Sequence, residues 1–534
     1  MSRRPGGAPP VGRRPGKDRL AVALPGHPGA SRFAPDHRPR VLVIGGGIAG
    51  LAAATVLAER GARVVVRERV GYLGGRVGGW PTTLADGTAV TMSRGFHAFF
   101  RQYYNLRALL ARTDPALTRL RALADYPLWH AGGHRESFAA IPRTLPFNAL
   151  GYLMRSPTFR WADLARVNAR SALAMLDVSV PGTYRELDGF DAASYLRDIR
   201  FPPAARALAL EVFSRSFFCH PERLSAGELV TMFHIYFLGS TEGLLFDVPT
   251  APFPEALWDP LREHLRGLGA QVHTDSGVAG LAPLPGGGFT VAAEAGPDER
   301  ADAVVLAADL AGAQRVVAGS PGLGDPDWRE RIAGLRGAEP FLVSRLWLDL
   351  PVRQDRPPFL GTSGYDLLDN ISVLDRYEDQ AQRWARRTGG SVVELHGYAV
   401  PPDSDEDHLH QRLVAQLHRV YPETAAASVV DQRRELRADC PLFPPGGFAN
   451  RPEVATPDPR LVLAGDYVRA DLPVALMERA ATTGFLAANT LLRGWGVAGE
   501  PLWSVPTAGR NPMLRAAARR WGRPPVQSYP PVQS

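Results

Sequence analysis

The first strong apolar run of the chain covers residues 41–44 and stops at a turn made of glycines. The run reads Val-Leu-Val-Ile, residues 45–50 read Gly-Gly-Gly-Ile-Ala-Gly, and an alanine-rich apolar stretch continues to residue 58. A short apolar run before a glycine turn is typical of a buried strand, and a longer run after it is typical of a buried helix. The pattern predicts a strand, a tight turn and a helix.

The same alternation of apolar strands and helices returns in later, separate parts of the chain. We expect a strand at 63–67, an amphipathic helix from 256 leading to a strand at 271–274, a strand at 301–307, and a strand at 460–466 with a helix over 473–492. Strands that alternate with helices form parallel sheets with helices on their faces. The predicted fold class is α/β, with a Rossmann-like, mostly parallel sheet built from discontinuous segments.

The spacing of the glycines gives the turn a chemical meaning. Gly45, Gly47 and Gly50 match the G-x-G-x-x-G pattern of dinucleotide-binding turns. In that pattern the first glycine allows the tight turn, the second lets a pyrophosphate approach, and the third lets the helix pack on the strand. Ile48 and Ala49 begin the helix, whose positive end favours phosphate. The turn therefore predicts a dinucleotide site.

Two charged residues downstream suit the same ligand. Glu68 follows the strand at 63–67 and lies 23 residues after Gly45, where a carboxylate can bind ribose hydroxyl groups. Gly75 and Arg76 follow it. A guanidinium beside a diphosphate forms charge-assisted, bidentate hydrogen bonds. We therefore expect all these residues to surround one bound dinucleotide.

Composition and charge narrow the class of protein. The chain has 534 residues, of which 45% are hydrophobic and 22% charged, which is typical of a soluble protein of two or three domains. The net charge of +7 comes from the two ends of the chain, and the body between them is mildly acidic. Because a nucleic-acid site needs a basic face on folded structure, we exclude nucleic acid as a partner.

Cysteine content and apolar runs bear on location. Two cysteines are too few for a disulfide framework, no apolar segment follows the N-terminal arginines, and no metal site is predicted. We therefore expect a cytoplasmic protein. The apolar segments 145–154 and 229–238 are too short to span a bilayer, but with the basic ends they predict peripheral binding to a membrane surface. Basic ends that are merely solvated are the alternative.

Composition also suggests domain boundaries. The Pro-, Gly- and Arg-rich residues 1–38 and the tail 506–534 are predicted to be disordered. The cofactor-binding domain is assigned to 39–110, 255–320 and 456–500. An inserted α+β substrate-binding domain is assigned to 111–254 and 321–455.

Three motifs resemble one known group of enzymes. Residues 95–106, Gly-Phe-His-Ala-Phe-Phe-Arg-Gln-Tyr-Tyr-Asn-Leu, resemble a segment of plant-type phytoene and ζ-carotene desaturases. Gly-Gly-Arg at 74–76 and the segments 464–468 and 473–484 resemble flavin motifs of the same superfamily. The chain is thus similar to the FAD-dependent carotenoid desaturase and amine oxidase superfamily. With the basic arm and Leu-Pro-Phe-Asn at 145–148, it most resembles the isorenieratene synthase family of β-carotene desaturase/methylases.

This resemblance implies FAD as the cofactor and assigns roles to further residues. Arg76 would meet the pyrophosphate, and Val278 would contact the adenine. The loop Met92-Ser93-Arg94-Gly95 would lie against the isoalloxazine, with Met92 and Ser93 as its binding residues. Gly465 and Asp466 would bind a phosphate or the ribityl chain. The start of the helix at Met477 would point its dipole at the flavin ring, which stabilises the reduced anion.

The resemblance also implies a reaction. Enzymes of this family convert the β-rings of β-carotene to aromatic rings by two desaturations per ring and a 1,2-methyl migration. A carotene has no acidic proton, so hydride abstraction by oxidised flavin must start the reaction. The electrons would pass to a membrane quinone or to oxygen. His97 is a candidate general base, and a hydrogen-bonded structural histidine is the other interpretation.

Two other functions remain open at this point. One is an acyclic carotene desaturase or isomerase of the ζ-carotene or phytoene type. The other is a membrane-associated flavin- or carotenoid-binding protein without turnover. An amine oxidase is disfavoured, because the single lysine of the chain, Lys17, lies in the N-terminal arm.

Overall fold

A parallel sheet of five strands forms one lobe of the molecule. The computed structural model describes residues 14–139, 141–142, 166–200 and 215–522. The strand order is β11-β3-β2-β15-β21, and every neighbouring pair is parallel. The strands are β2 (Arg40–Ile44), β3 (Arg63–Arg67), β11 (Gln271–His273), β15 (Ala303–Leu306) and β21 (Leu461–Leu463).

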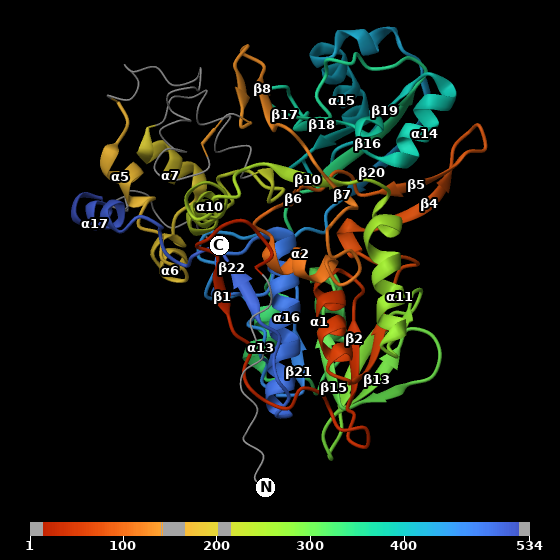
Figure 1. Cartoon of the computed structure of the whole chain (residues 1–534), viewed down its shortest axis with the longest axis vertical. Coiled ribbons are helices and arrows are strands. Elements are labelled where there is room, and N and C mark those ends of the chain that lie inside the picture. The colour runs from red at the N-terminus through yellow and green to blue at the C-terminus, as the bar shows by residue number, and fades with distance from the viewer. Residues whose placement is uncertain (1–13, 140, 143–165, 201–214, 523–534) are drawn as a thin grey trace.

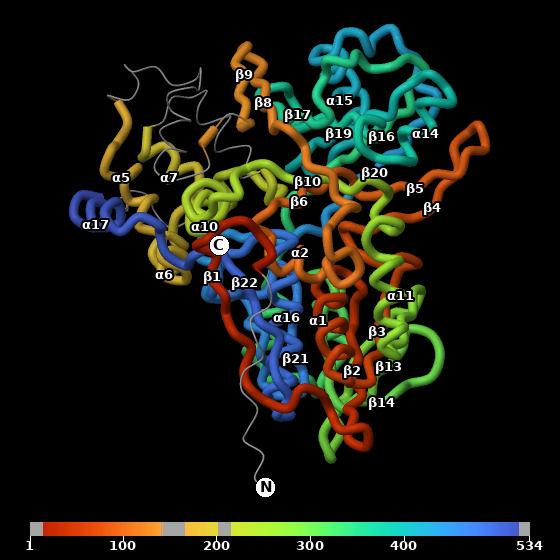
Figure 2. Tube along the Cα trace, viewed as in Figure 1, coloured from red at the N-terminus to blue at the C-terminus, as the bar shows by residue number. Residues whose placement is uncertain are grey.

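Segments far apart in the sequence meet in this lobe, where red, green and blue parts of the trace lie together (Figure 2). The predicted fold class, with a Rossmann-like sheet of discontinuous segments, is confirmed. The predicted domain boundaries stay a prediction.

Two helices pack together beside the parallel sheet (Figure 1). They are α1 (Ile48–Glu59) and α16 (Leu476–Gly494). Helix α1 is apolar on all sides and almost wholly buried, as expected for a helix enclosed by other elements. Close packing depends on glycine, because a Cβ at Gly50 would collide with the carbonyl oxygen of Gly45, and one at Gly484 with that of Ala49.

The second lobe is built on a mixed sheet of seven strands, in the order β20-β16-β19-β18-β17-β8-β9. Its pairs are antiparallel except β17 with β8. Helices α14 (Asp379–Thr388) and α15 (Glu406–Val420) pack against it. The strands are β8 (Pro127–His130), β9 (Arg135–Ser137), β16 (Phe341–Leu348), β17 (Phe359–Ser363), β18 (Asn370–Val373), β19 (Ser391–Gly397) and β20 (Val429–Arg437).

Three small sheets and several short helices are also part of the described chain. The small sheets are formed by β4 (Gly79–Thr83) with β5 (Ala89–Ser93), by β6 (Phe99–Phe100), β10 (Phe246–Pro249) and β7 (Leu120–Ala122), and by β12 (Val278–Pro283), β13 (Phe289–Ala293) and β14 (Glu299–Ala301). The remaining helices are α2 (Tyr104–Leu110), α5 (Ala169–Ala174), α6 (Gly182–Leu187), α7 (Ala192–Ile199), α10 (Ala226–Phe233), α11 (Asp259–Gly267), α12 (Leu310–Ala318), α13 (Pro326–Ala333) and α17 (Pro512–Trp521).

The predicted disorder of 1–38 and 506–534 is wrong for the parts of these ends that the structure describes. Strand β1 (Val22–Leu24) pairs with β22 (Leu502–Ser504), and the fully buried Asp18 forms an ion pair with Arg510 at 2.7 Å. Helix α17 packs on α5. The prediction of disorder from composition failed here because each end is ordered by contacts with the other end or with the body. Residues 1–13 and 523–534 lie outside the described residues.

The segment 229–238 does not form a membrane-contact patch. It continues from α10 into a π-helical turn (His234–Leu238), and all its residues except Phe233 are buried in the core. Its apolar side chains are therefore covered by protein, which corrects the prediction for this segment. Segment 145–154 lies outside the described residues. Within the described part of the chain, no helix combines the length and apolarity needed to cross a bilayer.

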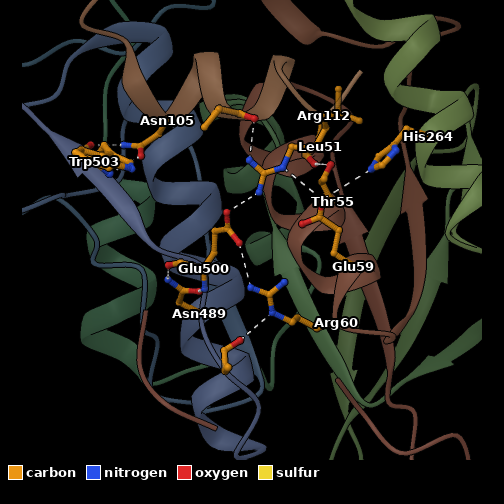
Figure 3. Close-up of polar contacts among 12 residues, drawn as sticks. Leu51, Thr55, Glu59, Arg60, Asn105, Arg112, His264, Asn489, Glu500 and Trp503 are labelled. Carbon is orange, nitrogen blue, oxygen red and sulfur yellow. Dashed lines mark hydrogen bonds and ion pairs between the residues drawn. The ribbon is translucent and has the colours of Figure 1, made fainter. Parts of the chain in front are cut away.

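Charged groups join the helices of the first lobe (Figure 3). Glu500 binds Arg112 at 2.5 Å and Arg60 at 3.1 Å, and Arg112 also reaches Glu59 of α1 at 3.3 Å. The backbone of Glu500 exchanges two hydrogen bonds with the side chain of Asn489 of α16. This network fixes α1, the end of α2 and α16 relative to one another.

Candidate functional site

A large cavity extends from the glycine turn of the parallel sheet to the face of the mixed sheet. Its wall includes most of the residues singled out from the sequence. These are Gly45, Gly47, Ile48, Ala49, Glu68, Gly75, Arg76, His97, Val278, Gly465, Asp466 and Met477.

The glycine turn forms one end of the cavity. Gly45 has a positive φ of 108°, a conformation that side chains disfavour. A Cβ at Gly47 would meet no protein atom closer than the Cα of Gly75, at 3.9 Å, so the space beside it is open. The first turn of α1 has no side-chain cap. Backbone N–H groups beside open space are a suitable cradle for a phosphate.

Glu68 closes the side of this turn. Its carboxylate accepts hydrogen bonds from the backbone N–H groups of Gly46 at 2.7 Å and Val70 at 3.0 Å. Burial raises the pKa of Glu68, and these two bonds oppose the rise. The carboxylate thus lies at the end of β3 beside the turn, where a ribose is expected.

Arg76 supplies a buried positive charge on the same wall. Its guanidinium lies 2.6 Å from Asp466, which follows β21. Burial alone would lower the pKa of Arg76, but the carboxylate of Asp466 outweighs burial and raises it. The guanidinium is therefore permanently charged, as a diphosphate partner must be. Buried Cys440 lines the cavity beside it.

The start of α16 also faces the cavity. Met477 lies in its first turn, and the preceding residue Leu476 has a positive φ of 51°. Among the residues that the structure describes, no side chain caps this end of the helix. Its first N–H groups and positive dipole end are thus available to a ligand. Open space at Gly47, a charged Arg76 and two uncapped helix ends together fit a dinucleotide.

Three predicted cofactor residues are not part of this wall. Gly50 is buried inside α1 and serves the packing of helix on strand. Met92 is buried, and the hydroxyl of Ser93 accepts a hydrogen bond from Arg345 at 2.8 Å instead of facing the cavity. The next residue, Arg94, lines the cavity and pairs with Asp439. Of the loop after β5 that was expected to lie against the flavin, Arg94 thus faces the cavity, whereas Met92 and Ser93 do not.

His97 lines the cavity but is weakly basic. Its Nδ1–H donates to the carbonyl oxygen of Gly95 at 2.9 Å. Burial lowers the pKa of His97 to about 4, and nearby positive charge on Arg76 contributes. His97 is therefore neutral near pH 7.

Aromatic side chains line the other end of the cavity. Phe96 stacks on Phe359 with ring centroids 4.2 Å apart, and Phe246 stands edge-on to both. Tyr126 meets Phe246 and Phe359 edge-on. Phe246 belongs to an aromatic-rich sequence segment, but Phe359 and Tyr126 are ordinary strand-type residues by sequence. Only the pairing of β17 in the mixed sheet brings Phe359 beside Phe96.

Polar side chains of β18 and β19 interrupt the aromatic wall. Tyr398 and His396 line the cavity, as do Asp369 and Asn370. Burial raises the pKa of Asp369 to about 6, although Arg215 opposes the rise. The sequence analysis identified none of these four residues, because none lies in a recognisable motif.

Comparison with known proteins was made on the whole chain. Residues 48–492 match the family model for flavin containing amine oxidoreductase. A carotenoid phi-ring synthase of Streptomyces griseus is 60% identical over 95% of this chain and 98% of its own length. One of Chlorobaculum tepidum is 27% identical over 88% of this chain and 91% of its own. The structure of cyclohexylamine oxidase from Brevibacterium oxydans has a similar fold, with a TM-score of 0.63 at 14% identity, over 86% of this chain and all of that one.

Proposed function

Because the chain belongs to the flavin containing amine oxidoreductase family, we propose that it is a flavoenzyme that converts the β-rings of β-carotene to aromatic rings. The observation that carries this proposal is the 60% identity, over nearly the whole of both chains, to a carotenoid phi-ring synthase. The reaction comprises two desaturations per ring and a 1,2-methyl migration. The aromatic end of the cavity supports a hydrocarbon substrate.

FAD is the proposed cofactor. Its pyrophosphate would lie between Gly47 and Arg76, with Glu68 at the ribose and the first turn of α16 at the flavin. A bound flavin would supply a two-electron acceptor for hydride. The proposed FAD-binding residues are the predicted ones that line the cavity, together with Arg94, which lines it where Met92 and Ser93 do not.

The aromatic end of the cavity would bind and orient one ring of the carotene. Phe96, Phe246 and Phe359 enclose it with apolar faces and exclude water, which would otherwise quench a carbocation. Aromatic faces also stabilise positive charge electrostatically. Such a chamber favours reactions that pass through a delocalised cation. A cation next to the quaternary ring carbon would draw a methyl group across, and aromaticity would make that step irreversible.

We also propose that the protein works at the cytoplasmic surface of a membrane, because β-carotene is delivered from lipid. The electron acceptor would be a membrane quinone or oxygen. Among the described residues, Met513 and Trp521 of α17 are strongly exposed, at 78% and 60%, and Arg520 lies over the Trp521 ring. An exposed tryptophan beside arginines suits a membrane interface.

Expression in cells that accumulate β-carotene tests the proposed function. We expect a new pigment with the same forty carbons and aromatic end rings, because flavin chemistry has no route to expel a methyl anion. Mass spectrometry should show the loss of four hydrogens for each converted ring. A product with fewer carbons would refute the methyl migration. A fully conjugated acyclic product from an acyclic precursor would support the alternative function of an acyclic carotene desaturase. Bound pigment without turnover would support the alternative of a carotenoid-binding protein.

A further inference from the structure

A chain of hydrogen bonds leads from the aromatic end of the cavity into the mixed sheet. The Tyr398 hydroxyl accepts from the Asn370 amide at 3.0 Å and lies 3.0 Å from Nδ1 of His396. Nε2 of His396 lies 3.0 Å from the carboxylate of Glu394. The other oxygen of Glu394 accepts two hydrogen bonds from Arg345, at 2.7 and 2.9 Å. Tyr398 and His396 belong to the cavity wall, and Glu394 lies behind them, fully buried.

Charge fixes the direction of these hydrogen bonds. Burial alone would raise the pKa of Glu394, but Arg345 and His396 outweigh burial and lower it to about 2. A carboxylate 3.0 Å from a ring nitrogen requires a proton between them, because two lone pairs repel. Nε2 of His396 therefore carries the proton and Nδ1 accepts from Tyr398. The weaker contact of Nε2 with the Phe96 N–H, at 3.2 Å, cannot form at the same time.

His396 and His97 differ in their hydrogen-bond partners. Protonated His396 would be held between a carboxylate and a phenol. His97 bonds a backbone carbonyl and, among the described residues, no carboxylate, and the charge of Arg76 disfavours its protonation. Of the two histidines on the cavity wall, His396 is thus the one whose hydrogen bonds connect a hydroxyl group of the wall to a buried carboxylate.

We infer that Tyr398 and His396 accept the proton that each desaturation releases, and that Glu394 and Arg345 hold the imidazole for this task. This inference rests on the proposed function. Once a hydride has left the ring, which a bound oxidised flavin would accept, a C–H bond next to the cation breaks. Its electron pair forms the new double bond, and its proton goes to the Tyr398 oxygen. The hydroxyl proton of Tyr398 passes at the same time to Nδ1 of His396.

A second, smaller cavity continues the path beyond His396. Glu394 contributes to its wall together with Tyr377 and Glu378. Glu378 is half-buried, and burial raises its pKa to about 7, although the charge of Arg345 opposes the rise. A carboxyl group with this pKa exchanges protons with water near neutral pH. The smaller cavity therefore gives the proton a route away from the apolar chamber.

The test compares three variants of the flavin-loaded enzyme. Tyr398→Phe removes the hydroxyl and keeps the ring, and Glu394→Gln removes the charge and keeps the shape. Tyr421→Phe is the matched control, because Tyr421 is buried in the mixed-sheet core away from the cavity and its hydroxyl has no partner among the described residues. Bound flavin is measured by visible absorbance in each. Flavin reduction by β-carotene without oxygen is measured for the wild type. Turnover of β-carotene with an added quinone as electron acceptor is then followed for all proteins over a range of pH.

For Tyr398→Phe we expect kcat to fall about 100-fold with KM and flavin content unchanged, since general acid–base groups contribute at least this much. Glu394→Gln should move the acid limb of the pH profile to lower pH by about one unit, because an imidazolium without its carboxylate loses its proton more readily. The other groups facing His396 are Arg345, Asp369, His97 and Tyr398, and they are unchanged in this variant.

The outcomes separate the inference from the function on which it rests. Full activity of Tyr398→Phe, or a fall no larger than that of Tyr421→Phe, would overturn the relay while the function stands. An unchanged acid limb in Glu394→Gln would overturn the role of the carboxylate. Failure of the wild-type protein to show any carotene-dependent flavin reduction would overturn the proposed function and the relay with it.

Discussion

Gly47 shows how one missing side chain makes room for a ligand. Its φ is −76°, which any residue can adopt, so the backbone does not require glycine here. The requirement comes from the space beside it, into which a Cβ would project without touching protein. A larger residue at this position would leave the fold intact and occupy the place proposed for the pyrophosphate.

We therefore predict that Gly47→Val binds FAD roughly tenfold to a hundredfold more weakly, which corresponds to the loss of one or two charge-assisted bonds. Flavin content after gel filtration measures this, and thermal unfolding of the flavin-free protein should be nearly unchanged. Gly494→Val is the control, because Gly494 is exposed and surrounded by open space. Equal flavin content in the two variants would contradict the proposed location.

Glu478 illustrates a buried carboxyl group with a structural role. Its two oxygens accept hydrogen bonds from the backbone N–H groups of Asn105 and Leu106, at 2.8 and 2.9 Å, and so cap the start of α2. The side chain of Asn105 donates a hydrogen bond to Thr482 of α16. It also exchanges two hydrogen bonds with the backbone of Trp503 (Figure 3). In the desaturase-like segment, Asn105 and Leu106 thus hold α2 on α16 and do not face the ligand.

Glu478 should make stability depend on pH. Burial raises its pKa from 4.5 to about 8, so the folded chain binds this proton more tightly than the unfolded chain. Folding is therefore favoured at low pH, and this contribution is lost as pH rises from about 4.5 to about 8. The unfolding temperature of Glu478→Gln should decline less over this range than that of the wild type. If the unfolding temperatures of the two proteins declined in parallel, Glu478 would be ionised over this whole pH range.

At the scale of elements, the contact of α1, α2 and α16 depends on Glu500. The side chains of Glu500, Arg112 and Arg60 are only 13–17% exposed. Removal of the Glu500 carboxylate leaves the largely buried guanidinium groups of Arg112 and Arg60 without their shared partner. Such a change costs far more than the loss of an exposed ion pair.

Glu500→Ala should lower the free energy of unfolding by about 3 kcal/mol. Denaturant titration measures this, with Glu263→Ala as the control, since Glu263 pairs with Arg266 on the exposed face of α11. The control should be close to the wild type. Equal effects of the two substitutions would mean that the network contributes no more than a surface pair.

At the scale of the whole molecule, the two ends of the chain are part of the fold. The Asp18–Arg510 pair and the β1–β22 pairing join them, so deletion of the ends would disturb the body as well as remove charge. Point substitutions on α17 are therefore the better test of membrane binding. Its exposed side chains, Met513 and Trp521, lie away from the cavity wall.

We predict that the double variant Met513→Ala/Trp521→Ala is recovered less than the wild type in flotation with anionic liposomes. Binding of the wild type should weaken as salt is raised, because arginines near the surface contribute. Leu350→Ala is the control, since Leu350 is an exposed apolar residue of the other lobe. Equal recovery of all three proteins would show that Met513 and Trp521 of α17 do not contribute to membrane binding.

The sequence alone predicted the strand, glycine turn and helix of residues 41–58, the α/β fold class and the family. The strand, turn and helix are local features, because they lie within about twenty residues and the spacing of the glycines specifies their backbone conformation. The strand at 461–463 was also recognisable, since a fully buried parallel strand is apolar throughout.

Only the tertiary structure decided what the cavity contains besides these motifs. Phe359, His396 and Tyr398 are unremarkable in the sequence, and they share a cavity wall with Phe96 because β17, β18 and β19 pair in one sheet across long sequence separations. The same holds for Asp18 and Arg510, which composition placed in disordered ends. Local patterns specify local backbone structure, whereas the burial and partners of a side chain depend on segments that approach it only in the folded chain.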